Sequence, residues 1–153
     1  MGTGDVIYRR ARLTDAAALL PLMRAFSRAE GIPFREPAIH AGLARLLRAR
    51  RLGVVMVAEQ SQSATLVGYA IGTFGYDLEF AGRDAFLTEL FVQSRHRRGG
   101  VGRGVLDATL RALAAGGARA VTLLVLAGNR AARRLYSTAG FRPVPRVPMV
   151  RVF

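Results

Sequence analysis

The sequence of 153 residues has no cysteine, no lysine and only two histidines. The absence of cysteine excludes disulfide bonds, thiolate metal sites and a covalent cysteine intermediate. His40 and His96 are too few for a metal centre built on histidines, so no metal is expected. Any catalysis by histidine would have to rest on one of these two residues.

Long hydrophobic runs are also missing. No apolar stretch approaches the roughly 20 residues of a membrane-spanning helix, and the short N-terminal segment, which contains Asp5, is a poor signal peptide. The hydrophobic content of 51% is nevertheless enough for a folded core. We therefore expect one domain over residues 1–153, located in the cytoplasm and without a membrane partner.

Negative charge is scarce. Ten acidic residues stand against 23 basic ones, all of them arginine, and the formal net charge is +13. Arginine binds phosphate through a bidentate fork, and an excess of positive charge attracts anionic partners such as nucleotides or RNA. Genomic base composition can explain the use of arginine in place of lysine, but it does not remove the excess charge.

Hydrophobic periodicity predicts a layered α/β fold with a mixed sheet and the element order β-α-α-β-β-β-α-β-α-β. The predicted strands are residues 6–10, 54–58, 66–74, 86–92, 120–126 and 149–153, and residues 76–83 are predicted to be a loop. A first helix should begin after Thr14 as its N-cap and be kinked or restarted at Pro21. Three more helices are predicted, around residues 39–51, over 101–115 and from about 129 to 139.

The turn between strand 86–92 and helix 101–115 carries a phosphate-binding pattern. Residues 97–102 fit the pattern R-x-x-G-x-G. Glycines let the backbone approach an anion, and the free N–H groups and dipole of a helix N-terminus attract it. The pattern is not a Walker loop, because the required lysine is absent, and it lacks the ribose-binding acid of a dinucleotide fingerprint.

A second motif lies on the predicted helix 129–139. Residues 129–141 fit the pattern N-x-x-A-x-x-L-Y-x-x-x-G-F. Asn129, Ala132 and Tyr136 share one helix face at intervals of three and four residues. Gly140 suits a left-handed C-cap, and Phe141 can pack back on the helix.

With both motifs in this order, the sequence resembles the GCN5-related N-acetyltransferase (GNAT) superfamily. Residues 82–92 are similar to a bacterial branch of polyamine and small-amine acetyltransferases. The resemblance covers residues 8–141 and implies that strands 86–92 and 120–126 splay apart to receive acetyl-CoA as co-substrate. It implies that the following residues bind CoA: Leu90, Phe91, Val92, Arg97, Arg98, Gly99, Gly100, Val101, Gly102, Arg103, Asn129, Ala132 and Tyr136.

The resemblance also assigns Tyr136 as the acid that protonates the departing thiolate. A thiol has a pKa of about 8.5 and a phenol one of about 10, so Tyr136 is protonated at neutral pH and can protonate the thiolate if it lies near the sulfur. A main-chain N–H on the strand that ends at Val92 would stabilise the oxyanion.

The general base stays open. The related branch has an acid at the position of Thr88, and threonine cannot act as a base at neutral pH. Glu89 is the remaining candidate, but strand alternation puts it on the face opposite Thr88 unless a bulge re-aims it. A further family position for a base is occupied by Leu124, and ordered water is the alternative to a side chain.

The acceptor is predicted to be a primary amine on a small molecule. Glu30 matches a substrate-contacting acid of the polyamine-type relatives, Thr88 would be a second contact, and Asp77 and Glu79 are weaker candidates. A chain this basic is an unusual receptor for a polycation. Acetylation of a protein or aminoacyl-tRNA amine, and a non-catalytic module that binds CoA or nucleic acid, therefore stay open. The apolar tail 147–153 could supply a strand to a homodimer partner.

Overall fold

A five-stranded mixed sheet with the order β1-β2-β3-β4-β5 organises the molecule. The computed structural model describes residues 5–153. The pairings β1–β2, β2–β3 and β3–β4 are antiparallel, whereas β4 and β5 are parallel. The mixed α/β fold predicted from the sequence is therefore confirmed. The strands are β1 (Val6–Arg10), β2 (Gly53–Gln60), β3 (Thr65–Asp77), β4 (Gly82–Val92) and β5 (Val121–Leu123).

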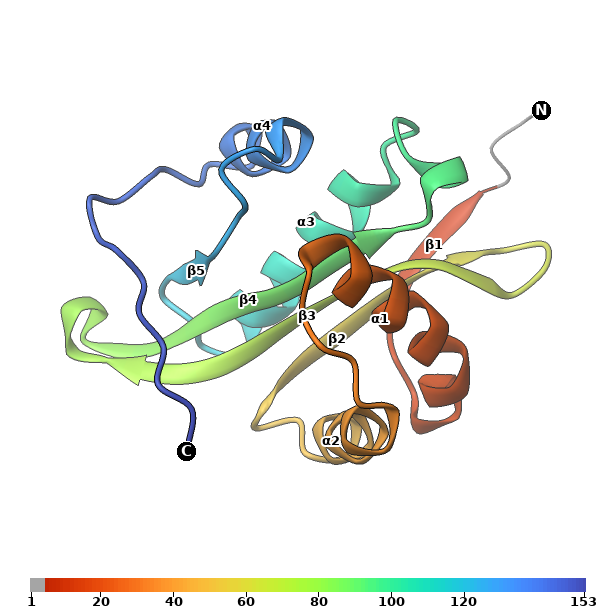
Figure 1. Cartoon of the computed structure of the whole chain (residues 1–153), viewed down its shortest axis with the longest axis horizontal. Helices are drawn as coiled ribbons and strands as arrows, with labels where there is room; N and C mark the ends of the chain where they lie inside the picture. The colour runs from red at the N-terminus through yellow and green to blue at the C-terminus, as the bar shows by residue number, and fades with distance from the viewer. Residues whose placement is uncertain (1–4) are drawn as a thin grey trace.

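Helices cover both faces of this sheet (Figure 1). The helices α1 (Ala16–Glu30) and α2 (Glu36–Arg48) pack on one face through a cluster that includes Leu19, Leu43 and Tyr69. The helix α3 (Val101–Ala115) packs on the other face, and α4 (Arg130–Thr138) follows the end of β5. Adjacent strand residues enter opposite clusters, as the twofold side-chain period of a strand requires. Within residues 5–153, no helix is both long and apolar enough to cross a membrane.

The start of the first helix differs from the prediction. Thr14 lies inside a short 3-10 turn, and Asp15 is the residue that precedes α1. The Asp15 carboxylate accepts hydrogen bonds from the Arg12 N–H and from the Arg9 guanidinium, so it joins the turn to β1. Pro21 lies within α1, which runs from Ala16 to Glu30 as one helix; the predicted restart is wrong.

Three strand boundaries also differ. Half of the predicted loop 76–83 is strand, because β3 and β4 form a long hairpin closed by the turn Leu78–Phe80. Only Val121–Leu123 of the predicted strand 120–126 pairs with β4. The predicted final strand, residues 149–153, does not form. Residues 149–153 are exposed and pair with no strand of the described sheet, and the prolines at 143, 145 and 148 lack amide donors in the segment that leads into them.

The packing of β2 against β3 can be tested at Gly53, where the two backbones approach closely. A Cβ on Gly53 would lie 2.3 Å from the Gly72 carbonyl oxygen and 3.1 Å from the Thr73 Cα. Because both are backbone atoms, Gly53→Ala should lower the free energy of unfolding by about 1–3 kcal/mol in a denaturant titration. Gly42→Ala is the matched control, since a Cβ there meets nothing within 4 Å inside α2; it should stabilise by up to about 1 kcal/mol. Equal effects of the two changes would contradict the close approach.

Candidate active site

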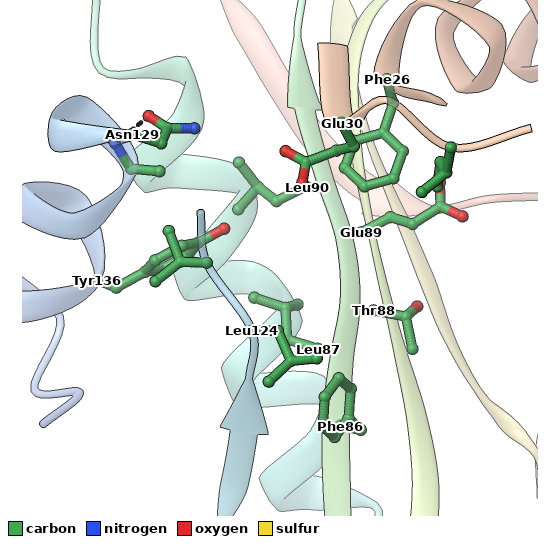
Figure 2. A pocket seen from close by; sticks show the side chains of 13 residues that line it. Phe26, Glu30, Phe86, Leu87, Thr88, Glu89, Leu90, Leu124, Asn129 and Tyr136 are labelled. Atoms are coloured by element: carbon green, nitrogen blue, oxygen red, sulfur yellow. Dashed lines mark hydrogen bonds between the residues drawn. The ribbon is translucent and has the colours of Figure 1, made fainter. Parts of the chain in front are cut away.

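A cavity opens where β4 and β5 separate. The two strands pair through only three residue pairs, which end at Leu87 and Leu123. Beyond this point, side chains from α1, β4, α4 and the segment after β5 surround a cavity of about 280 Å³ (Figure 2). The lining residues are Phe26, Glu30, Ile32, Phe86, Leu87, Thr88, Glu89, Leu90, Leu124, Val125, Asn129, Ala132 and Tyr136.

A β-bulge at Thr88 decides which side chains of β4 face which layer. Leu87 pairs with Gly72 and Glu89 pairs with Ile71, so Thr88 is an extra residue without a register partner in β3, although its hydroxyl donates to the Ile71 carbonyl. One extra residue reverses the alternation of the strand. Leu87 therefore belongs to the α3 layer, whereas Glu89 reaches Tyr69 in the α1 and α2 layer. The bulge that would re-aim Glu89 is present.

Glu89 is partly buried beside a tyrosine from the neighbouring strand. The hydroxyl of Tyr69, whose side chain is fully buried, donates a hydrogen bond to the Glu89 carboxylate. Burial raises the pKa of Glu89, and the hydrogen bond from Tyr69 lowers it in part. Burial and the adjacent carboxylate also raise the pKa of Tyr69, so the tyrosine stays protonated as the donor.

Tyr136 faces the cavity from α4. Its ring packs edge-on against Phe141, with 5.8 Å between the ring centroids. Burial, and secondarily the negative charge of Glu30, raise the pKa of Tyr136 to about 12. The phenol is therefore protonated at neutral pH and can donate a proton.

Glu30 reaches the same cavity from the opposite side. It is the last residue of α1, which ends at Gly31 in a left-handed conformation with φ of 69°. Figure 2 shows the Glu30 carboxylate directed over β4 toward the side that holds Tyr136, whereas Glu89 and Thr88 leave β4 on the other side. Among residues 5–153, Glu30 takes part in no ion pair.

The glycine-rich turn lies between β4 and α3. Gly100 caps α3 in a left-handed conformation with φ of 83°, and a Cβ there would meet nothing within 4 Å. As Gly100 has no side chain to accept a hydrogen bond, the first N–H groups of α3 have neither an intrahelical nor a capping partner. This arrangement fits a phosphate group at the positive end of the helix dipole.

The arginines of this turn are partly engaged by the protein itself. The Arg97 Nε donates to the Val92 carbonyl over 2.8 Å, and its guanidinium lies 5.5 Å from the centre of the Phe91 ring. Arg103 forms an ion pair with Asp107, one turn later on α3. Arg98 adopts φ of 65°, which turns the chain toward α3. Arg97 thus braces the turn against β4.

The structure gathers only part of the predicted site in the cavity. Its lining contains Glu30, Thr88, Glu89, Leu90, Asn129, Ala132 and Tyr136. Phe91 and Val92 are buried in the clusters on either side of the sheet. The predicted residues 97–103 form the adjacent turn and not the cavity wall. Asn129 accepts a hydrogen bond from the Ala132 N–H and so caps α4.

Several lining residues were not predicted from the sequence. The missed residues are Phe26, Ile32, Phe86, Leu87 and Val125, all apolar, together with Tyr69 behind Glu89. The apolar residues look like ordinary core positions in a periodic pattern, so periodicity gives no signal for them. Tyr69 lies 20 residues from Glu89 along the chain, and only the β3–β4 register brings them together.

A phosphate-suited turn next to a cavity with a phenol and two carboxylates suits group transfer from a phosphate-containing donor, and the comparisons with known proteins specify the family. Residues 19–141 match the acetyltransferase (GNAT) family. This match covers most of the chain, so the protein belongs to the GNAT family. It is an N-acetyltransferase, with acetyl-CoA as its co-substrate. No curated protein sequence matches the chain.

Solved structures share the whole fold. An integron cassette protein from the mobile metagenome of Cole Harbour Salt Marsh is 25% identical, with a TM-score of 0.82 over 95% of this chain and 89% of that one. An aminoglycoside N-acetyltransferase in complex with CoA is 18% identical, with a TM-score of 0.84 over 99% of this chain and 97% of that one. A ribosomal-protein-alanine N-acetyltransferase from Brucella melitensis is 19% identical, with a TM-score of 0.77 over 97% of this chain and 100% of that one. The last two likenesses are at the level of the fold.

From the Tyr69–Glu89 hydrogen bond we expect Tyr69→Phe to change how the stability of the protein depends on pH. The variant loses the bond that lowers the pKa of Glu89, so that pKa should rise further. A carboxyl whose folded pKa exceeds its unfolded value destabilises the fold as pH rises through that interval. The variant should therefore lose more stability above the Glu89 pKa than below it. Carboxyl titration by NMR and denaturant unfolding over about pH 4 to 8 measure both effects.

The control is the double variant Tyr69→Phe/Glu89→Gln, which has no carboxyl to titrate at this position. The stability of this double variant should lack the additional pH dependence expected for Tyr69→Phe, although it too lacks the tyrosine hydroxyl. An unchanged Glu89 titration in Tyr69→Phe would show that the hydrogen bond does not act on the carboxylate.

Proposed function

We propose that the enzyme transfers the acetyl group of acetyl-CoA directly to the primary amine of a small molecule. The observation that carries this proposal is the cavity at the β4–β5 separation, which brings Tyr136 together with two carboxylates, Glu30 and Glu89. Amine acetylation needs a group that removes a proton from the amine and a group that protonates the leaving thiolate. The cavity wall offers both kinds of group.

The donor would be held by the turn and by β4. Gly100 and the N–H groups of Val101 and Gly102 are suited to the pyrophosphate, and the nearby Arg98 and Arg103 add positive potential. Beyond Leu87, β4 has no β5 partner, and main-chain groups of Leu90, Phe91 and Val92 other than the Val92 carbonyl, which accepts from Arg97, can offer hydrogen bonds to the pantetheine arm. Bound there, acetyl-CoA supplies the acetyl group as an activated thioester.

Glu89 is assigned as the general base. Because its pKa is raised by burial, the carboxylate is a stronger proton acceptor near neutral pH than an exposed glutamate. The bulge leaves main-chain groups around Thr88 outside the ladder with β3, and one such N–H can stabilise developing negative charge on an oxygen. Tyr136 Oη is assigned as the proton donor to the thiolate, and Glu30 as the receptor for the acceptor's ammonium group.

The first test concerns the donor. Acetyl-CoA should raise the melting temperature, because a ligand that binds only the folded state stabilises it by mass action. At 100 times the dissociation constant the gain is about 2.7 kcal/mol, or roughly 5–10 °C for a protein of this size. NAD and ATP, which also carry phosphates but no pantetheine, should leave the melting temperature unchanged. The same shift with all three ligands would mean a general anion site.

The second test concerns Tyr136. Tyr136→Phe should reduce kcat about 100-fold or more, since general acid catalysis contributes at least that much, while the acetyl-CoA dissociation constant stays within about twofold. Tyr76→Phe is the matched control, because Tyr76 is 74% exposed and lies outside the cavity. Steady-state kinetics with CoA release as the readout give kcat for both variants. Full activity of Tyr136→Phe would remove this residue from the mechanism.

A further inference from the structure

The cavity is free of arginine in a chain that has 23 of them. Eight of its lining side chains are apolar, two are carboxylates and three are uncharged polar groups. The lining therefore carries acidic groups and no basic ones, whereas the net charge of the whole chain is +13. A single ammonium group gains from the carboxylates of the lining, but every further positive charge on a ligand is repelled by the net positive charge of the chain.

Only one of the two carboxylates has no partner within the described chain. Glu89 already accepts the hydrogen bond from Tyr69. Glu30 has no ion pair among residues 5–153, and it lies at the C-terminal end of α1, where the helix dipole adds negative potential. The cavity thus offers one clear receptor for a cation.

Apolar side chains flank this receptor. Phe26 lies one helical turn before Glu30 on the same face of α1. Ile32 follows the left-handed Gly31, and its N–H donates to the Ser27 carbonyl, which fixes it beside the helix end. Across the cavity, Leu124 follows the last paired residue of β5. Ile32 is 50% exposed and Leu124 62% exposed, so both present apolar surface that a ligand could cover.

We propose that the acceptor is an amine with one positive charge on an apolar alkyl or aryl body, bound with its ammonium group at Glu30 and its body against Phe26, Ile32 and Leu124. The proposal rests on the acetyl transfer inferred above and names the substrate class for that site. A polyamine would bring further ammonium groups without matching carboxylates. A hydroxyl-rich aminosugar would bury donors and acceptors against apolar walls without partners.

The first experiment compares hexylamine with 1,6-diaminohexane at saturating acetyl-CoA. The two share a six-carbon chain and differ by one ammonium group. 2-Phenylethylamine, spermidine and neamine extend the comparison, and CoA release with mass analysis of the product gives kcat/KM. Hexylamine and 2-phenylethylamine should exceed the three polycations by about tenfold or more, which is within the range that apolar pockets achieve. Equal or greater activity with the polycations would overturn the proposal.

The second experiment locates the ammonium site. Glu30→Gln should raise the KM for hexylamine about tenfold and leave the acetyl-CoA thermal shift intact, since it removes the charge that pairs with the amine. Glu36→Gln is the matched control, because Glu36 is an exposed acid on α2 that pairs with Arg24 outside the cavity. An unchanged KM in Glu30→Gln overturns the assignment of the ammonium site.

Failure of this inference and failure of the proposed function are distinguishable. If acetyl-CoA stabilises the protein but neither hexylamine nor 2-phenylethylamine is acetylated, the acceptor class proposed here is wrong and donor binding stands. If acetyl-CoA gives no shift and no amine is acetylated, the proposed acetyl transfer fails as well.

Discussion

The β-bulge at Thr88 is the constraint on which the site depends. Pairing of β4 with β5 ends at Leu87, the residue just before the bulge, and pairing with β3 resumes in a shifted register at Glu89. A bulge bends its strand and increases the local twist. The extra residue at Thr88 therefore has two effects on the site. It moves β4 out of line with β5, where the cavity opens, and it turns Glu89 toward α1 and Tyr69. An unbulged β4 would keep Glu89 on the α3 face.

Charge divides the site into two regions. The turn before α3 presents arginines and unpaired N–H groups, which suit the phosphates of a nucleotide-containing donor. The cavity presents Glu30 and Glu89 and no arginine, which suits an amine. In a chain with only ten acidic residues, two in one cavity of about 280 Å³ are a strong local concentration. The net charge of +13 therefore does not describe the lining of the cavity, where the proposal places the acceptor.

Local sequence signals predicted most of the fold, whereas the residues assigned to bind CoA stay a prediction. The bounds of α3 follow from a glycine that can adopt a left-handed conformation at 100, and the cap of α4 follows from Asn129. The bulge could not be predicted, because the residues around Thr88 read as a regular apolar strand and the register is set by pairing with β3. The Tyr69–Glu89 contact depends on the same register. The prediction of a final strand at residues 149–153 was wrong, because hydrophobic periodicity does not show whether a segment has a neighbouring strand to pair with.

The proposed roles of Glu30 and Tyr136 are linked by electrostatics. The pKa of Tyr136 is raised first by burial and then by the negative charge of Glu30, which faces it across the cavity. An ammonium group paired with Glu30 would cancel much of that charge, and the pKa of Tyr136 would fall toward the value that burial alone sets. On these assignments, the phenol becomes a stronger acid only when an acceptor is bound. The proton donor for the thiolate would then be weakest in the absence of an amine, when loss of the acetyl group to water would waste the donor.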